Sequence, residues 1–443
     1  MFLFSKNEEL TVDILNKMLN KYATTYLPVL KHYKDYFDGK QKILTKQYED
    51  PSKPCNRTVT NFCRTITNTF LGYLAAPNHI TYQSNDDITQ LMEVLDYNDH
   101  DAEDCDFLRD ALIYGVANEL MFIDNDSKAR FTTVSPLSSF GIFDDCLNGD
   151  LLYFVRWYKQ SDWEDSENYF LDVYTDKEIR HYTMLGLNGP LEFLSAEPHY
   201  FNQCPANVFY LEDEKSIFEC IETLQDAYNE TLSNQIDDIA AFTNAYMVMS
   251  GSFDPENVDT NKMRTNRLIM MPEGTEVKWL TKDIQDTQVK DNLDRLQELI
   301  YKIAQCPDFS SDLFLGGVSS GVAIKYRMTI METRAAPIVA AMKKALQRRI
   351  EILCGFVSLM LGEEVYRDIK INFERNIPTD LTALASCVSQ LEGIVSDETL
   401  LSTLPFVEDP KEEAEKVKEQ KESQMDLYNN AFVTGDNYGE KEK

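Results

Sequence analysis

Two long helical segments on either side of a short β segment restrict the fold of this chain more than any other feature of its sequence. Residues 217–249 place apolar side chains at the spacing of one helix face, and residues 287–303 repeat the pattern. Between them, a segment with glycine and proline at 251–255 ends the first helix, and β-forming runs at 267–271 and 277–280 predict two strands. This order predicts a helix, a small β-hairpin and a second helix, which is an economical way to extend a narrow projection from a larger body.

The residues before 217 show patterns of both helices and strands. Apolar residues at helical spacing predict a first helix that ends at Pro28, a second helix over 58–73 and an acidic amphipathic helix near 88–95. From residue 108 to residue 210, short β-forming runs separated by polar turns predict an antiparallel β-meander. The expected strands lie at 120–123, 131–134, 151–158, 169–174 and 179–184.

The region after this unit begins with a stretch rich in glycine and serine at 307–320 and continues as a helix over 321–361. Pro337 interrupts that helix. Because proline removes one hydrogen bond of the helix and clashes with the preceding turn, the helix should kink there. The chain from Glu408 onward is charged and polar. Taken together, the segments predict an α+β fold.

The charge of the chain restricts its partners. It has 43 Lys and Arg against 74 Asp and Glu, a net charge of -31, which repels nucleic acid. The charge therefore argues against tight DNA binding, because proteins that bind DNA tightly neutralise phosphates with a basic face, whereas a protein that lets DNA pass is compatible with this charge. The nine cysteines are scattered, which predicts buried, reduced thiols. The most apolar run, 350–361, is too short to span a bilayer, so no membrane association is expected.

Enzymatic motifs are incomplete. Residues 316–321 begin like a phosphate-binding loop, but Val322 follows the second glycine where such a loop needs lysine. Paired acids at 144–145, 237–238 and 363–364 are expected by chance in so acidic a chain. A zinc site built from distant cysteines and histidines stays open as an alternative. We expect no catalytic residue, no metal and no cofactor.

A series of short segments carries a further signal, because the segments keep their order over nearly the whole chain. They are 36–44 (YFDGKQKIL), 56–62 (NRTVTNF), 70–77 (FLGYLAAP), 111–119, 134–136, 226–229, 245–251, 319–326, 394–401 and 407–413. In order and spacing they resemble the portal proteins of long-tailed phages of Gram-positive bacteria. Ala76 departs from the family pattern, which usually has glycine before the proline.

This resemblance implies a portal fold and a ring, usually of twelve subunits, around an axial channel. It divides the chain into an α/β wing, a two-helix stem, a small β-hairpin clip, a long kinked helix and a small helical crown. The implied boundaries are 1–216 for the wing, 217–250 and 284–305 for the stem helices, 251–283 for the clip, 306–320 for a channel (tunnel) loop, 321–375 for the kinked wing helix and the following strand, and 376–443 for the crown and charged C-terminal tail.

The resemblance also implies partners and a location. The ring would assemble in the host cytoplasm, occupy the portal vertex of the capsid in the virion, and pass double-stranded DNA without sequence preference. Its protein partners would be further copies of itself, the terminase large subunit, a head–tail adaptor and the major capsid or scaffold protein. Two other classes remain as alternatives: a DNA-processing enzyme (a nuclease or packaging ATPase), and another head–tail structural protein such as an adaptor. The missing nucleotide loop argues against an ATPase, and the length of the chain argues against an adaptor.

Two groups of residues are candidate sites of a portal. The basic residues Lys262, Arg264 and Arg267 would dock an acidic partner on the clip, or else form a solvated flank of the hairpin. The loop residues would touch passing DNA by shape, with glycines for backbone freedom and acids to keep the charge negative. They are Asp308, Ser310, Ser311, Asp312, Gly316, Gly317, Ser319 and Ser320. The alternative is an ordinary connector packed beneath the wing by Phe309 and Phe314.

Overall fold

The computed structural model of this chain describes most of its residues. They are 2–51, 53–76, 79–147, 149–159, 168–187, 189–242, 246–250, 276–280, 286–309, 321–361, 368–375, 381–391, 393–401, 404, 407, 413–418 and 420. The chain packs as two units, one of residues 1–309 and 328–376 and one of residues 310–327 and 377–443. The second unit contains the short helices α11 (Leu381–Leu391) and α12 (Asp397–Leu401).

The first unit begins with a short strand and a series of helices. They are β1 (Phe2–Phe4), α1 (Val12–Lys21), a π-helical turn (Tyr22–Tyr26), α2 (Leu27–Asp38), α3 (Phe62–Leu74), α4 (Thr89–Tyr97) and α5 (His100–Tyr114). The prediction that the first helix ends at Pro28 is wrong, because Pro28 lies in the first turn of α2. The π turn before it already departs from the regular hydrogen-bond ladder, so the missing N–H of the proline is tolerated there.

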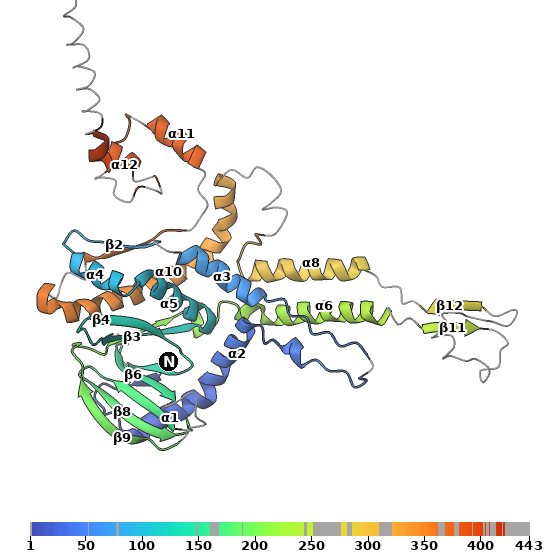
Figure 1. The fold of residues 1–443 in the computed structure, drawn as a ribbon, viewed down its shortest axis with the longest axis horizontal. Coiled ribbons are helices and arrows are strands. Elements are labelled where there is room, and N and C mark those ends of the chain that lie inside the picture. Colours follow the sequence, from blue (N-terminus) through green and yellow to red (C-terminus); the bar gives the residue numbers. More distant parts are fainter. Residues whose placement is uncertain are drawn as a thin grey trace, which may run out of the picture. The chain divides into compact units, whose positions relative to one another are not determined.

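The predicted meander is divided between two sheets, because the expected strands at 120–123 and 131–134 lie in a separate three-stranded sheet. The other expected strands belong to a six-stranded sheet with the order β1-β5-β6-β7-β8-β9 (Figure 1). Its strands after β1 are β5 (Ser139–Asp144), β6 (Leu151–Lys159), β7 (Asn168–Tyr174), β8 (Glu178–Leu185) and β9 (Glu192–Pro198), which pair antiparallel in sequence order. The strand β1 was not predicted, and it joins the edge of the sheet parallel to β5. The expected strands at 151–158, 169–174 and 179–184 are confirmed.

A second, three-stranded sheet has the order β10-β3-β4 and consists of β10 (Ala206–Tyr210), β3 (Val116–Ile123) and β4 (Ala129–Val134). A buried apolar cluster joins it to the larger sheet, with Leu120 and Ala206 on one side and Phe154 and Tyr174 on the other. The meander region begins later than predicted, because residues up to Tyr114 belong to α5.

The predicted order of helix, β segment and helix in the middle of the chain is confirmed, with shorter helices, but the described strand pair is not the predicted one. The elements are α6 (Glu222–Phe242), β11 (Tyr246–Ser250), β12 (Glu276–Leu280) and α8 (Asp286–Ile303). The first helix was expected to reach residue 249, but residues 246–250 form a strand that pairs antiparallel with β12. Tyr246 and Val248 have a high β propensity, and their pairing with β12 outweighs the helical spacing of the apolar residues there. The strand expected at 267–271 lies outside the described residues.

The long helix α10 (Gly321–Leu361) has the predicted bounds, and Pro337 lies inside it. That the helix kinks at this proline stays a prediction. The strand β13 (Lys370–Phe373) pairs with β2 (Ile80–Gln83). No helix in the described part of the chain is long and apolar enough to cross a membrane.

A fully buried arginine fixes α10 to the rest of the first unit. Arg349 is 0% exposed and forms ion pairs with Asp104 of α5 and, at 2.7 Å, with Glu119 of β3. Its guanidinium also lies 4.4 Å from the ring centre of Phe131 in β4. Asn207 of β10 donates hydrogen bonds both to Glu119 and to the Ala345 carbonyl of α10. The ion pairs and the amide therefore connect the long helix to α5 and to the smaller sheet.

The cysteines in the described part of the chain carry free thiols, as predicted. They are not all buried, however. Cys63, Cys204 and Cys306 are buried, whereas Cys146 and Cys220 are exposed.

Candidate functional site: the α6–α8 pair and its anchor

The helices α6 and α8 lie side by side in the first unit (Figure 1). An aromatic residue from the start of α3 packs between them. The Phe62 ring meets Tyr228 of α6 at 5.1 Å and Tyr301 of α8 at 5.8 Å between ring centres, both edge-on. Such aromatic pairs add specific attraction beyond the buried area, so one end of the helix pair is firmly seated on α3.

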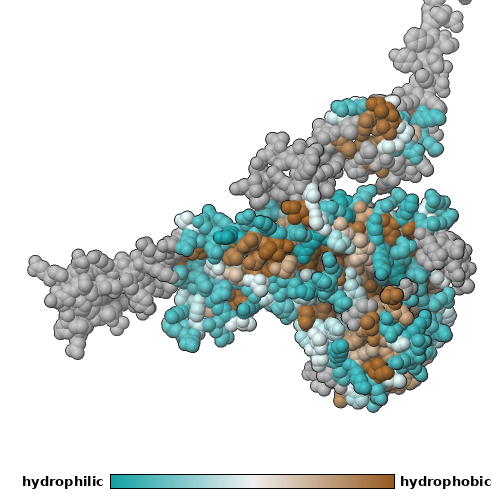
Figure 2. All heavy atoms as spheres, turned by 180° about the vertical axis from the view of Figure 1, so that it is seen from behind, coloured by the Kyte–Doolittle hydropathy of each residue, from teal (hydrophilic) through white to brown (hydrophobic). Residues whose placement is uncertain are grey.

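Apolar side chains on both helices are only partly covered. Those that are half-buried are Leu224, Leu232 and Ile236 on α6 and Val289, Leu293, Leu296 and Leu299 on α8. Ile303 of α8 is 45% exposed. Figure 2 shows apolar side chains gathered over the helix pair, with hydrophilic ones around them. Contiguous apolar surface of this kind, bordered by polar residues, marks an interaction site.

A stripe of buried polar side chains anchors α6 to the N-terminal part of the chain. Gln225, Asn229, Ser233 and Asp237 follow one another at every fourth position, so they lie in a row along one face of the helix. The first three are 0% exposed and Asp237 is 7% exposed. Polar groups so deeply buried need partners, and the segment 46–62 supplies them.

The partners are backbone N–H groups of alternate residues, which bond to successive side chains of the stripe. Asn56 donates to Asp237 Oδ1 at 2.6 Å, and Thr58 donates to Ser233 Oγ at 3.0 Å. Further along, the N–H of Thr60 bonds to Asn229 Oδ1 at 2.9 Å. The last contact joins Phe62 N–H to Gln225 Oε1 at 3.0 Å. The segment therefore runs antiparallel to α6.

The extended segment 56–62 stays in register with the stripe on α6 because the repeat lengths of the two structures agree. Two residues of extended chain advance by about 6.6 Å, and four residues of α-helix advance by about 6 Å. Each N–H on one side of the segment 56–62 therefore meets the next side chain of the stripe. The same bonds explain why residues 58–61, expected to be helical, are not: α3 begins only at Phe62, with Asn61 as its N-cap.

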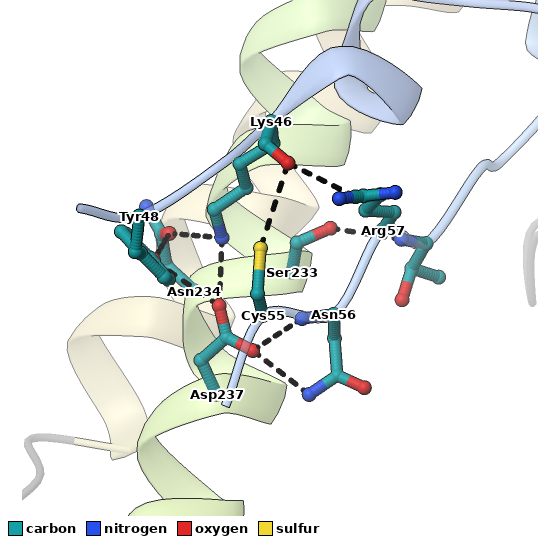
Figure 3. Close-up of polar contacts among 9 residues, drawn as sticks. Lys46, Tyr48, Cys55, Asn56, Arg57, Ser233, Asn234 and Asp237 are labelled. Carbon is teal, nitrogen blue, oxygen red and sulfur yellow. Dashed lines mark hydrogen bonds and ion pairs between the residues drawn. The ribbon is translucent and has the colours of Figure 1, made fainter. Parts of the chain in front are cut away.

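Asp237, the last residue of the stripe, accepts hydrogen bonds from three residues of segment 46–62 (Figure 3). Besides the N–H of Asn56, it accepts from the Asn56 side chain at 2.8 Å, from Lys46 Nζ at 2.7 Å and from the Tyr48 hydroxyl at 3.2 Å. Burial alone would raise the pKa of Asp237, but the hydrogen bonds from Lys46 and Asn56 outweigh it and hold the pKa below its ordinary value.

We expect the contribution of Asp237 to stability to depend on acid pH. A carboxyl group whose pKa is lowered on folding stabilises the fold above its unfolded pKa of about 4, and this is lost as pH falls through the folded pKa. Asp237→Asn should therefore lower the free energy of unfolding at pH 7, and the difference from wild type should shrink below about pH 4. Urea unfolding of both proteins across that range measures it. A difference independent of pH would contradict the role of the ionised carboxylate.

A second set of contacts connects α2 to the start of α6. The Tyr36 hydroxyl donates to the Asp226 carboxylate at 3.0 Å, and His32 Nε2 lies 3.0 Å from Glu222 Oε2. The amide of Asn229 donates to Gln41 Oε1 at 2.6 Å. Thus α6 is held on two sides by polar contacts, while its apolar face remains partly open.

Few of the sequence-predicted site residues lie in the described part of the chain. Asp308 does, and it accepts a hydrogen bond from Gln297 of α8 at 3.0 Å. The neighbouring Phe309 is 45% exposed. The other loop residues, Ser310 to Ser320, lie outside the described residues, as do Lys262, Arg264 and Arg267 of the hairpin.

The polar stripe was missed in the sequence, although a signal was present. The prediction of this helix rested on its apolar face, and the polar row lies beside that face. Gln225, Asn229, Ser233 and Asp237 stand at a strict spacing of four, and such residues at that spacing on a helix predict a polar partner along it.

Within the described residues, one group has the composition of a metal site: Asp144, Asp145 and Cys146. Asp145 and Cys146 are exposed, and in so acidic a chain the cluster carries no functional conclusion.

Comparison with known proteins gives the family. A family model described as "Phage portal protein, SPP1 Gp6-like" matches residues 17–426. The "Portal protein" of Bacillus phage SPP1 is 22% identical over 422 residues, covering 90% of this chain and 82% of that protein. Among solved structures, a chain of the "Neck of empty GTA particle computed with C6 symmetry" is similar at 12% identity and a TM-score of 0.43, covering 78% of this chain and 86% of that one. Because the family match spans most of the chain, this protein belongs to the SPP1 Gp6-like family of phage portal proteins.

Proposed function

We propose that this chain assembles into the portal ring at one vertex of a phage capsid, as a conduit for double-stranded DNA, and that α6 and α8 form its stem. The observation that carries this proposal is the family match together with the partly covered apolar faces of the two helices. A ring of copies would bury those faces against neighbouring helices, which a monomer leaves in water. Twelve subunits is the number that the family resemblance implies.

The acidic charge suits a channel. A wall of net negative sign does not hold phosphates, so a duplex slides through instead of binding. Each copy in a ring adds a further net charge of -31 to the assembly. The role we propose is structural and non-enzymatic.

The proposed partners follow from the position of a portal between motor, capsid and tail. They are the terminase large subunit, a head–tail adaptor and the capsid or scaffold protein. Lys262, Arg264 and Arg267 would dock an acidic surface of one of them, and reversing their charge would weaken that binding while rings persist.

We also propose that residues 306–320 form the loop that approaches DNA in the channel. Its glycines would allow the backbone to adapt, and its acids would prevent tight binding. A reconstruction of the ring with this loop on the outer rim would contradict the assignment.

The stem assignment is tested by charge on the apolar face. Leu293→Glu should raise the subunit concentration needed for half-assembly of the ring at least tenfold, because it places a buried, unpaired carboxylate in each interface. Lys290→Glu, on an exposed position one turn away, is the matched control and should assemble. Mass photometry over a concentration series measures both. If the two variants assemble equally well, α8 does not form the ring interface.

A further inference from the structure

A cavity of about 240 Å³ lies in the first unit, between its N-terminal helices and the two sheets. The π-helical turn and α2 line it on one side, and strands of both sheets line it on the other. Val29 of α2 belongs to the lining and is 48% exposed, so the cavity opens to solvent there. Much of the lining is aromatic and comes from Phe2, Tyr22, Tyr26, Tyr33, Phe140 and Tyr210.

One carboxylate gives this aromatic cavity a negative charge. Among the described residues that line it, Glu214 alone is charged. Glu214 is exposed, which places it at the opening of the cavity. Burial raises the pKa of the Tyr210 hydroxyl in the lining, and the negative charge of Glu214 raises it further. The carboxylate therefore acts on the aromatic lining, and aromatic rings beside a carboxylate favour an organic cation.

The backbone holds Glu214 at this place in an unfavourable conformation. The φ angles are 62° at Asp213 and 53° at Glu214, in the left-handed region that residues other than glycine seldom adopt. Gly115 fixes the turn. Its carbonyl accepts a hydrogen bond from Leu211 N–H at 3.0 Å, and a Cβ atom at Gly115 would lie 2.5 Å from the backbone of Glu214. Strained residues that their surroundings hold in place concentrate at binding sites.

The volume of the cavity sets the class of ligand. A cavity of about 150 Å³ holds one benzene ring, and sites for drug-sized molecules have about 300–1,000 Å³. This cavity lies between the two and suits one ring with a short stem. We infer that it binds a small arylalkylamine, whose ring lies among the aromatic side chains and whose ammonium group pairs with Glu214 at the opening.

Two probes of nearly equal shape test this inference. 2-Phenylethylamine carries the ammonium group, and 2-phenylethanol has a hydroxyl in its place. In saturation-transfer difference NMR with the purified full chain, both phenyl rings should receive saturation, and the amine should bind about fivefold more tightly. Glu214→Gln should remove that difference. Glu212→Gln, an exposed residue of the same turn that does not line the cavity, is the matched control and should keep it.

A variant that blocks the opening gives a second measurement. Val29→Trp changes an exposed position, so the fold should persist, and thermal unfolding checks this. Neither probe should then receive saturation. Equal affinity of wild type for the two probes would overturn the inference, as would an amine affinity that Glu214→Gln leaves unchanged or binding that persists in Val29→Trp. Each of these results leaves the proposed function intact, because ring assembly is not required for the site.

Discussion

Replacing Arg349 by methionine is expected to lower the free energy of unfolding by about 3–5 kcal/mol. The guanidinium is fully buried and is paired with Asp104 and Glu119, which are themselves buried. Methionine fills much of the same space but removes the charge. Two buried carboxylates are then left without a counter-ion, and that desolvation is the source of the loss.

The neighbouring arginine provides a matched control. The side chain of Arg348 is 29% exposed and pairs with Glu351 one turn along the same helix at 2.8 Å. Because solvent screens such a pair, Arg348→Met should change stability by less than about 1 kcal/mol. Urea unfolding followed by tryptophan fluorescence compares the two variants. Equal effects would show that the buried ion pairs do not fix α10.

Asn229→Ala should lower the free energy of unfolding by about 2–4 kcal/mol. The amide accepts from the N–H of Thr60 and donates to Gln41, both in buried or half-buried surroundings. Each group left without a partner costs about 1–3 kcal/mol. The hydrogen bonds between the polar stripe and segment 46–62 hold this segment on α6. The variant should therefore also increase proteolysis within segment 46–62.

Glu230, the next residue of α6, is exposed and serves as the control. Glu230→Ala should stay within about 0.5 kcal/mol of wild type. If Asn229→Ala behaved like Glu230→Ala, the polar stripe would not contribute to anchoring the helix, and the apolar contacts of Phe62 would have to account for it.

Elements with strong periodicity were predictable from the sequence. The helix α8 and the bounds of α10 agree with the pattern, as do the meander strands β6, β7 and β8. Their apolar spacing is long enough to select one period over another. The family resemblance, based on the order of short segments, was also sufficient to predict the portal class.

Elements that depend on distant partners were not predictable. The strand β1 has three residues and exists because β5 offers an edge. Residues 58–61 share the apolar pattern that predicts a helix over 58–73, but hydrogen bonds to the stripe on α6 keep them out of that helix. Arg349 looks like any arginine of a helix, and its partner Asp104 is 245 residues away in the chain. In each case the deciding interaction is long-range, which a local pattern does not contain.

The central claim is that this chain forms a ring. Negative-stain imaging of the purified full-length protein, without DNA or nucleotide, tests it most directly. We predict closed rings with a central hole, each subunit contributing its α6–α8 pair to the wall, and a mass that is a whole multiple of 51.1 kDa. Particles that remain monomeric at high protein concentration and moderate salt would contradict it.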